Sequence, residues 1–461
     1  MSEPAYRRWI CDACGYIYDE ARGDPDSGLA PGTRYEAIAE DWQCPLCGLT
    51  KADLRPLPEA PVALAAAPRR GPRPAAGALC RGGDDYVVIV GAGIAGWSVA
   101  ESIRRHDRET PILLISACEG LSYPKPALST ALAQGKSADD LIEQDAVTRA
   151  AALGLAVRTE TRVIKIDVTK RRLTTSKGGI QYATLILALG AHQRQLPISG
   201  DAADSVLRVN DLAAYKKLRQ RLDGKARHVT ILGAGLIGCE FAEDLTSAGY
   251  PVSVIDLAAR PLASMLPVDL AEGLEYRLKE KGVDWHLNVT LDSAERSGER
   301  LRAVLSDGEA IETDLILSAA GLVANTQLAE KAGLRVGRGI ATDRHMRTSQ
   351  AHIYTIGDCA EVEGEIYGYI EPIRRQAETI AADLRGASLP FEPLPPLVRV
   401  KTPSFPLTIC GPLKGDDPAI IPQAHAEPGR VDYLQSGRLV GFVLSGNSAA
   451  NATTVYQELF A

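Results

Sequence analysis

Short, mainly apolar runs alternate with segments of helical character along the chain from residue 85 onward. Apolar runs of four or five residues bounded by turn residues predict buried strands, and their alternation with helices predicts an α/β fold. The runs that carry this prediction are Tyr86–Val90, Ile112–Ile115, Val229–Leu232, Val252–Ile255 and Ile353–Ile356. Two of them lead into similar glycine-rich segments about 140 residues apart, which predicts two nucleotide-binding domains of similar build, one inserted in the other.

The pattern is different before residue 85. Residues 1–54 carry ten acidic and five basic side chains, a net charge of −5, and six aromatic residues: Tyr6, Trp9, Tyr16, Tyr18, Tyr35 and Trp42. A unit this short has little core, so it needs large aromatic side chains and a metal ion to fold. Residues 55–84 are rich in Pro, Ala, Gly and Arg and predict a flexible linker, spanning about 30 Å as a coil and up to about 90 Å extended.

Each glycine-rich segment has the pattern G-x-G-x-x-G between a predicted strand and a predicted helix, which is the context that makes this motif meaningful. The first glycine allows a tight turn, the second lets the backbone approach a pyrophosphate, and the third lets the helix pack close to the strand. The two sets are Gly91, Gly93 and Gly96, and Gly233, Gly235 and Gly238. Two copies in one chain predict two bound dinucleotides.

Acidic residues near the predicted strand ends are candidates for binding ribose hydroxyls. Asp256 follows the strand after the second glycine loop and favours NADH, because a carboxylate repels a 2′-phosphate; Arg260 nearby leaves NADPH open. Glu119 is the candidate after the first loop, although an exposed loop acid is an equal interpretation. Asp358 ends the run Ile353–Ile356 in a Gly-Asp pair, where a carboxylate can accept from a flavin ribityl hydroxyl or the pair can be a simple turn.

Four cysteines form two C-x-x-C pairs near the N-terminus: Cys11, Cys14, Cys44 and Cys47. Two such turns supply four thiolates in a tetrahedron, which suits either structural zinc or redox-active iron. The other five cysteines are scattered singly, unlike the framework of a secreted disulfide-rich protein. The inner cysteines of the two pairs are separated by 29 residues, more than the roughly 15–20 of common zinc ribbons, which favours iron.

Composition excludes some classes of function. The chain has 461 residues, 45% of them hydrophobic, and a net charge of −7 without a basic excess that would suggest nucleic acid binding. No apolar run approaches the roughly 20 residues needed to span a bilayer, and the N-terminus lacks an apolar signal core. We therefore expect a cytoplasmic protein.

Taken together, these motifs resemble those of two families. From residue 85 to the end the chain is similar to flavoprotein pyridine-nucleotide oxidoreductases, most closely the NADH:rubredoxin reductases. This resemblance rests on Ser122–Ser129, Leu232–Ala242, Gly357–Val362 and Val400–Pro403. Residues 1–54 resemble rubredoxin, through Cys11–Asp19, Gly23–Gly28, Pro31–Thr33 and Asp41–Gly48.

The resemblance implies FAD at the first glycine loop, with Asp358 at the ribityl chain, and NAD at the second. It also implies that Lys125 lies near the isoalloxazine, where its charge would stabilise reduced anionic flavin; a solvated surface lysine is the alternative. Glu240 would lie at the junction of nicotinamide and flavin, unless it is only a helix-surface acid. Lys401 would approach the flavin from the C-terminal domain.

The resemblance also predicts an α/β architecture with two Rossmann-like domains and a small C-terminal α+β domain, preceded by a small metal-stapled rubredoxin domain. The predicted bounds are 1–54 for the iron domain, 55–84 for the linker, 85–195 with 318–388 for the FAD-binding domain, 196–317 for the NAD-binding domain, and 389–461 for a C-terminal interface domain.

Disulfide reductases of this superfamily place a cysteine pair beside the flavin and a His-Glu base at the C-terminus. This chain has only Cys118 in the first region, and it ends in Tyr456–Ala461 without such a base. The sequence therefore predicts an FAD-dependent NAD(P)H:rubredoxin oxidoreductase, which passes electrons from NADH to FAD, to its own iron, and then to an external oxidase or hydroxylase such as an alkane monooxygenase.

Two alternatives stay open. One is a flavin reductase that serves an external iron–sulfur, oxygen-reducing or nitric-oxide-reducing partner. The other is a non-catalytic zinc-type interaction module fused to a flavin sensor, which would not turn over NADH.

Overall fold

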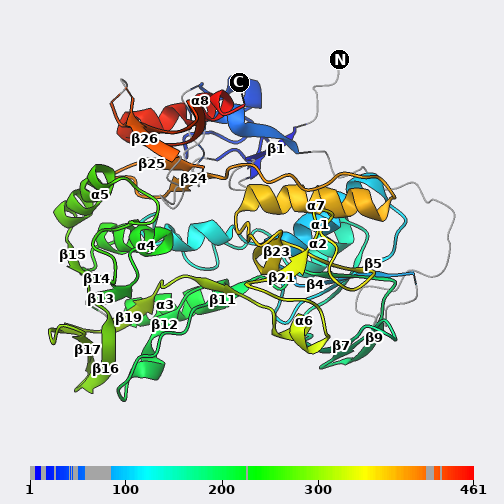
Figure 1. The fold of residues 1–461 in the computed structure, drawn as a ribbon, viewed down its shortest axis with the longest axis horizontal. Helices are drawn as coiled ribbons and strands as arrows, with labels where there is room; N and C mark the ends of the chain where they lie inside the picture. The colour runs from blue at the N-terminus through cyan, green and yellow to red at the C-terminus, as the bar shows by residue number, and fades with distance from the viewer. Residues whose placement is uncertain are drawn as a thin grey trace.

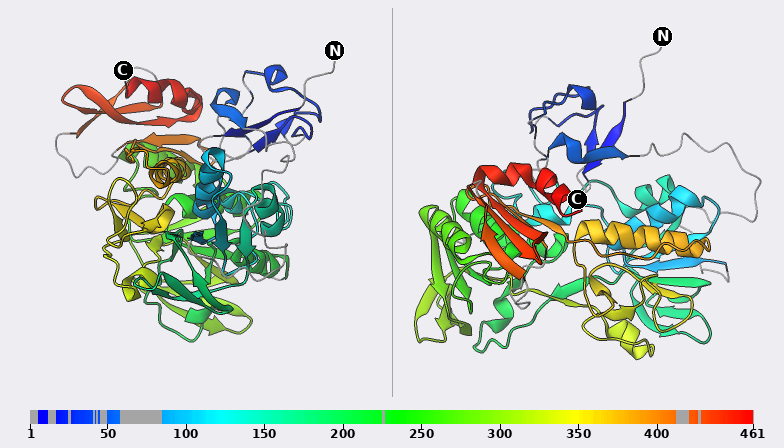
Figure 2. Two further views of the ribbon diagram at one scale, coloured as in Figure 1. Left: turned by 90° about the vertical axis from the view of Figure 1, so that its right-hand side faces the viewer. Right: turned by 45° about the horizontal axis from the view of Figure 1, so that its top comes forward.

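The computed structural model describes residues 6–11, 17–24, 27–40, 42, 44, 50–57, 85–224, 227–411, 420–425 and 428–460. The N-terminal domain and the C-terminal domain lie on one side of the molecule, above two α/β halves that stand next to each other (Figures 1 and 2).

The N-terminal domain is built on an antiparallel sheet of order β2-β1-β3. Its strands are β1 (Arg8–Cys11), β2 (Ile17–Asp19) and β3 (Leu54–Leu57), with the short 3-10 helices η2 (Tyr35–Ala37) and η3 (Lys51–Asp53). Trp9 and Tyr35 stack with ring centroids 3.7 Å apart, and the small buried core includes Tyr18, Trp42 and Cys11. Aromatic rings thus supply much of the apolar surface that so short a domain can bury.

The first α/β half contains a parallel five-stranded sheet of order β22-β10-β4-β5-β6 and an antiparallel sheet β7-β8-β9. All four residues of β4 and of β5 are buried, as expected for a parallel sheet covered on both faces. The elements are β4 (Val87–Val90), α1 (Ile94–His106), β5 (Ile112–Ile115), η4 (Lys125–Ser129), α2 (Ala146–Ala152), β6 (Ala156–Arg158), β7 (Val163–Asp167), β8 (Arg172–Thr175), β9 (Gly178–Gln181) and β10 (Thr184–Leu187).

The second α/β half repeats this plan, with a parallel sheet of order β12-β19-β13-β14-β15 and an antiparallel sheet β16-β17-β18. Its elements are η5 (Ala203–Ser205), β12 (Leu207–Arg208), α3 (Leu212–Gly224), β13 (Val229–Leu232), α4 (Leu236–Ser247), β14 (Val252–Asp256), α5 (Val268–Glu280), β15 (Val283–Leu287), β16 (Leu291–Ser297), β17 (Arg300–Leu305), β18 (Ala310–Thr313) and β19 (Leu315–Ser318).

The chain then returns to the first half. The two crossings between the halves pair with each other as antiparallel β11 (Ala191–Gln193) and β20 (Leu322–Ala324). The returning segment adds β22 to the first parallel sheet, and its long helix α7 packs against α1. Its elements are α6 (Gln327–Lys331), β21 (Ile340–Thr342), β22 (Ile353–Thr355), η6 (Gly357–Cys359), β23 (Ala360–Val362) and α7 (Ile370–Leu384). The second nucleotide-binding fold is therefore inserted in the first, as the sequence predicts.

The C-terminal domain is an antiparallel sheet of order β24-β25-β28-β27-β26 with a terminal helix. Its elements are β24 (Leu397–Val400), β25 (Leu407–Cys410), β26 (Ile420–Ala424), β27 (Arg430–Gln435), β28 (Arg438–Ser445), η7 (Gly446–Asn451) and α8 (Ala452–Glu458). The predicted fold class, two Rossmann-like domains with an α+β domain after them and a small domain before them, is confirmed.

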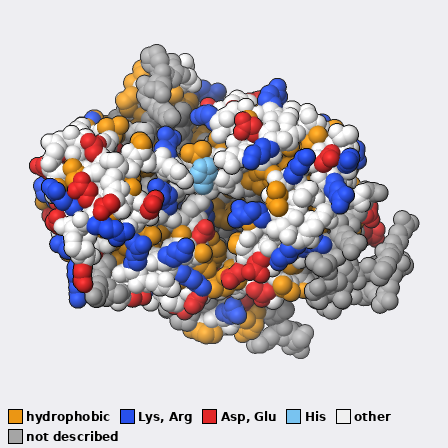
Figure 3. Space-filling model, turned by 90° about the horizontal axis from the view of Figure 1, so that it is seen from below, with side chains coloured by type: hydrophobic (Ala, Val, Ile, Leu, Met, Phe, Trp, Pro, Cys, Tyr) orange, Lys and Arg blue, Asp and Glu red, His pale blue; other side chains and the backbone are white. Residues whose placement is uncertain are grey.

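Charged side chains are mixed on the face shown in Figure 3, where Lys and Arg lie among Asp and Glu rather than in a region of one sign. None of the helices in the described part of the chain is long and apolar enough to cross a membrane.

Candidate functional site

The two glycine loops adopt the same conformation. Gly91 and Gly233 have φ of +118° and +108°, which only glycine adopts readily, and they begin the turn out of β4 and β13. A β-carbon at Gly96 or at Gly238 would lie 1.8 Å from the carbonyl oxygen of the first glycine of its own loop, so neither position admits a side chain.

Each loop has open space next to its second glycine. A β-carbon at Gly93 or Gly235 would meet no atom within 4 Å, and these residues are the N-caps of α1 and α4, neither of which has a side-chain capping bond. Each helix therefore presents backbone N–H groups and its positive dipole end to open space, which suits a pyrophosphate. The residues fit a dinucleotide at both loops.

Asp256 lies against the second loop. Its Oδ2 accepts from the Ala234 backbone N–H at 2.5 Å and its Oδ1 accepts from the Ala258 N–H at 2.7 Å. These bonds fix the carboxylate beside the loop at the end of β14. Arg260 lies 4.0 Å from Glu272 and is partly exposed.

The equivalent position after the first loop is a serine. Ile115 of β5 pairs with the last residue of β4, just as Ile255 of β14 pairs with the last residue of β13. The next residue is Ser116 in one sheet and Asp256 in the other. Glu119, the predicted candidate, lies three residues beyond Ser116 on an exposed loop. The strand register was the information that the sequence alone lacked.

Asp358 lies close to the first loop. The preceding residue, Gly357, packs so tightly on α1 that a β-carbon there would lie 2.8 Å from that of Ala95. The Gly357 N–H donates to Gln376 Oε1 on α7 at 2.9 Å, and Gln376 is fully buried. A β-carbon at Gly368, two residues before α7 begins, would lie 3.5 Å from Asp358 Oδ1. The Gly-Asp turn is thus held between the starts of α1 and α7.

The short helix η4 connects the two predicted dinucleotide sites. At its first position, burial lowers the pKa of Lys125, and the nearby carboxylates of Asp358 and Asp211 oppose this shift. At its last position, Ser129 Oγ donates to Glu240 Oε2 at 2.5 Å. Five residues of 3-10 helix span roughly 10 Å, so one short element carries Lys125, which is influenced by the charge of Asp358, at one end and bonds to Glu240 at the other.

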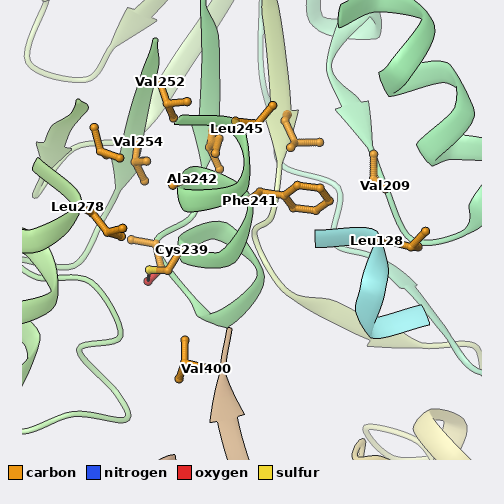
Figure 4. Packing of buried hydrophobic residues seen from close by; sticks show 14 of the residues in the cluster. Leu128, Val209, Cys239, Phe241, Ala242, Leu245, Val252, Val254, Leu278 and Val400 are labelled. Carbon is orange, nitrogen blue, oxygen red and sulfur yellow. Dashed lines mark hydrogen bonds between the residues drawn. The ribbon is translucent and has the colours of Figure 1, made fainter. Parts of the chain in front are cut away.

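Glu240 and Lys401 form a buried ion pair. Glu240 is 3% exposed, and its Oε2 accepts from Lys401 Nζ while its Oε1 accepts from the Lys401 backbone N–H at 3.1 Å. Glu240 lies on α4, and Lys401 follows β24 of the C-terminal domain. Figure 4 shows Leu128 from η4 and Val400 from β24 approaching α4 from different sides. The structure therefore brings Glu240, Lys401 and Ser129 together where three domains meet.

Two further acids of α4 complete this junction and were not predicted from the sequence. Asp244 Oδ1 accepts from the Ala133 N–H at 2.8 Å, and Glu243 Oε1 accepts from the Ser404 N–H at 2.8 Å. Burial raises the pKa of Asp244 to about 6. The spacing of Glu240, Glu243 and Asp244, three and four residues apart, is the pattern that could have indicated one functional face of the helix.

The predicted metal ligands are described in part. Cys11 and Cys44 are both buried in the core of the N-terminal domain, and within the described residues they form no disulfide with each other. Cys14 and Cys47 lie outside the described residues. Among the residues that are described, no group of three or more potential ligands meets. Buried cysteine sulfurs as donors fit a thiophilic ion such as iron or zinc.

Within the described residues, a hydrogen bond joins this domain to the first α/β half. Arg374 Nη1, on α7, donates to the backbone carbonyl of Cys11 at 3.1 Å. Arg374 was not predicted from the sequence, because nothing in its local pattern indicates a partner 363 residues away.

Comparison with known proteins agrees with this geometry. Residues 85–381 match the family of pyridine nucleotide-disulphide oxidoreductases, residues 8–54 match rubredoxin, and residues 393–459 match the family described as the rubredoxin binding C-terminal domain. The chain belongs to the pyridine nucleotide-disulphide oxidoreductase family, whose members use FAD and NAD(P)H. It carries a rubredoxin domain at the N-terminus of the same chain, which implies iron at the four cysteines.

Individual relatives show the same relationship. A rubredoxin–NAD(+) reductase from Alcanivorax borkumensis is 39% identical over 380 residues, 81% of this chain and 98% of the relative. A nitric oxide reductase FlRd–NAD(+) reductase from Vibrio vulnificus is 34% identical over 382 residues, with the same coverage of both chains. Among solved structures, a ferredoxin reductase from Rhodopseudomonas palustris superposes with a TM-score of 0.72 at 30% identity, covering 78% of this chain and 91% of its own.

Proposed function

We propose that this protein oxidises NADH and passes the electrons by way of FAD to iron in its own N-terminal domain, from which they leave to a separate acceptor protein. The observation that carries the proposal is the contact between Arg374 and Cys11, because it sets a predicted iron ligand against the helix that also holds the Gly357–Asp358 turn.

FAD and iron, when bound, supply the redox chemistry: NADH loses a hydride, and two electrons leave one at a time to ferric iron with release of one proton. The chain's own residues bind and orient. The two glycine loops and the helix ends that follow them would hold the pyrophosphates. Asp358 would accept from a ribityl hydroxyl of FAD, and Lys125 would supply a positive charge near the flavin. The Glu240–Lys401 pair fixes the C-terminal domain against the junction of the two nucleotide sites.

We further propose NADH as the preferred nucleotide. Support comes from Asp256, whose carboxylate is held beside the second loop by two backbone bonds, where it would repel a 2′-phosphate. We expect Asp256→Asn to raise the KM for NADH about tenfold and to lower that for NADPH, with kcat nearly unchanged. Equal KM values for the two nucleotides in the native protein would contradict the preference.

The downstream acceptor in this proposal is a separate oxidase or hydroxylase, such as an alkane monooxygenase. The second candidate is a reductase whose outlet is an external partner, for example a nitric-oxide-reducing one. It is favoured by the resemblance to the Vibrio relative, whose name refers to nitric oxide reductase.

The substitution Cys44→Ser separates these two candidates. If the proposal is correct, the variant loses the visible absorption of the ferric site and the NADH-driven reduction of added cytochrome c. It keeps the bleaching of flavin by NADH. Cys80→Ser, in the predicted linker, is the matched control and retains all three. Cytochrome c reduction at the native rate in Cys44→Ser would show that electrons leave without passing through the iron.

A further inference from the structure

Helix α7 makes hydrogen bonds to other parts of the chain on two of its sides. Arg374 donates to the carbonyl of Cys11, whereas Gln376, two residues later, accepts from the N–H of Gly357 in the Gly-Asp turn. Residues two apart lie about 200° apart around a helix, so the two contacts leave α7 in nearly opposite directions. The helix is therefore the wall between the predicted flavin site and the N-terminal domain, and its thickness is about 10–12 Å with side chains.

The contact partner on the N-terminal side is the end of β1. Cys11 is fully buried and is one of the predicted iron ligands, so a bond to its carbonyl positions the metal-binding strand itself rather than a remote surface of the domain. The adjacent Arg375 turns to its own half, where it lies 3.8 Å from Glu371 and over the ring of Phe391. Of these two neighbouring arginines, Arg374 is the one that the structure joins to the N-terminal domain.

We propose that Arg374 is the docking residue of the iron domain, and that α7, outside the C-terminal domain that matches the rubredoxin binding family, forms part of the docking surface. This inference rests on the proposed function. A guanidinium suits an occupant with a net charge of −5 in residues 1–54. One charge-assisted hydrogen bond is strong enough to favour the docked position and weak enough to release the domain for a later acceptor.

The linker makes a weak contact sufficient. The predicted linker begins at residue 55, but β3 extends the N-terminal sheet to Leu57, so the connection to the reductase half starts after that residue. Because this connection tethers the domain, its concentration near α7 is about millimolar without any binding energy. Loss of the Arg374 bond should therefore lower the equilibrium constant for docking about tenfold rather than abolish docking.

The test uses the full-length protein with FAD and iron bound. Arg374→Ala and Arg374→Lys are compared with the native chain and with Arg385→Ala, a control at the end of the same helix whose Nε donates to the Ala381 carbonyl within α7. Anaerobic stopped-flow mixing with NADH follows flavin bleaching and iron bleaching separately, and small-angle X-ray scattering without NADH reports the docked fraction.

We expect flavin bleaching to be unchanged in all variants, which also shows that the reductase half is folded. Iron bleaching should slow about tenfold in Arg374→Ala, recover in part in Arg374→Lys, and remain native in Arg385→Ala. The radius of gyration should increase most in Arg374→Ala, less in Arg374→Lys, and not in Arg385→Ala. Native iron bleaching and an unchanged radius of gyration in Arg374→Ala would overturn the inference. If the iron of the native protein stays ferric after the flavin has bleached, the proposed function is refuted. The scattering measurement does not depend on electron transfer, so it still tests whether Arg374 docks the domain.

Discussion

A buried carboxylate, Glu20, is expected to dominate the stability of the N-terminal domain. Glu20 is 1% exposed, and it accepts from the backbone N–H of Arg7 at 2.8 Å, Trp9 Nε1 at 2.9 Å, Arg34 Nη1 at 2.9 Å and the backbone N–H of Tyr35 at 3.1 Å. Burial by itself would raise its pKa, but the four donors outweigh this and lower the pKa from 4.5 to about 2.

The magnitude follows from this difference. A carboxyl group with a pKa of 4.5 in the unfolded chain and about 2 in the folded domain contributes about 3 kcal/mol to the free energy of unfolding. Because the folded pKa is lowered, the contribution is complete above pH 4.5 and is lost as the pH falls towards 2. Glu20→Gln should therefore destabilise the domain by about 3 kcal/mol near neutral pH, or roughly 10–20 °C in melting temperature for so small a unit.

The assay is thermal unfolding of the full-length protein, followed through the absorption of the ferric site at wavelengths longer than the flavin bands, where the signal comes from this domain. Glu36→Gln, on the exposed side of η2, is the matched control and should melt with the native protein. The native advantage over Glu20→Gln should shrink when the pH is lowered from about 7 to about 3. A Glu20→Gln domain that melts within about 2 °C of the native one at neutral pH would refute the reasoning.

Three further predictions concern the reductase half. Asp244→Asn should raise the melting temperature at about pH 8 and leave it unchanged at about pH 4. The pKa of Asp244 is raised from 3.8 to about 6 in the folded protein, so the stability that this group contributes falls as the pH rises through 6. Equal effects of the substitution at both pH values would contradict this. Lys401→Met should lower the free energy of unfolding by about 3 kcal/mol, because Glu240 is left buried without its cation. The double variant with Glu240→Gln should recover most of this loss, as measured by unfolding in denaturant. Purely additive losses in the two single variants and the double variant would exclude the ion pair as the cause. Gly96→Ala should abolish FAD binding, because the new methyl group would lie 1.8 Å from the Gly91 carbonyl oxygen. Binding is measured as the ratio of flavin to protein absorbance in the purified variant. One flavin per chain in this variant would show that the loop can rearrange.

Local chemistry made much of the architecture predictable. The turn at Gly91 requires positive φ and the position of Gly96 excludes a β-carbon, so glycine at these spacings indicates the loop wherever it occurs. The same reasoning applies to the second loop. Paired cysteines likewise indicate a metal site, because two thiolates with two residues between them can reach one ion.

Register was the first property that the sequence did not determine. Ser116 and Glu119 are separated by two residues, and either could have taken the position after β5 that Asp256 takes after β14. Only the pairing of whole strands, which aligns Ile115 with the last residue of β4, places Ser116 in the equivalent position.

Local sequence pattern is enough to identify two glycine loops of the dinucleotide-binding type and a cysteine pair toward each end of a small aromatic domain, because each motif depends on residues within a few positions of one another. Tertiary structure decided that Glu240 pairs with Lys401 and that Arg374 meets Cys11. These partners are 161 and 363 residues apart, and their meeting depends on how separately folded domains pack, which no local pattern encodes.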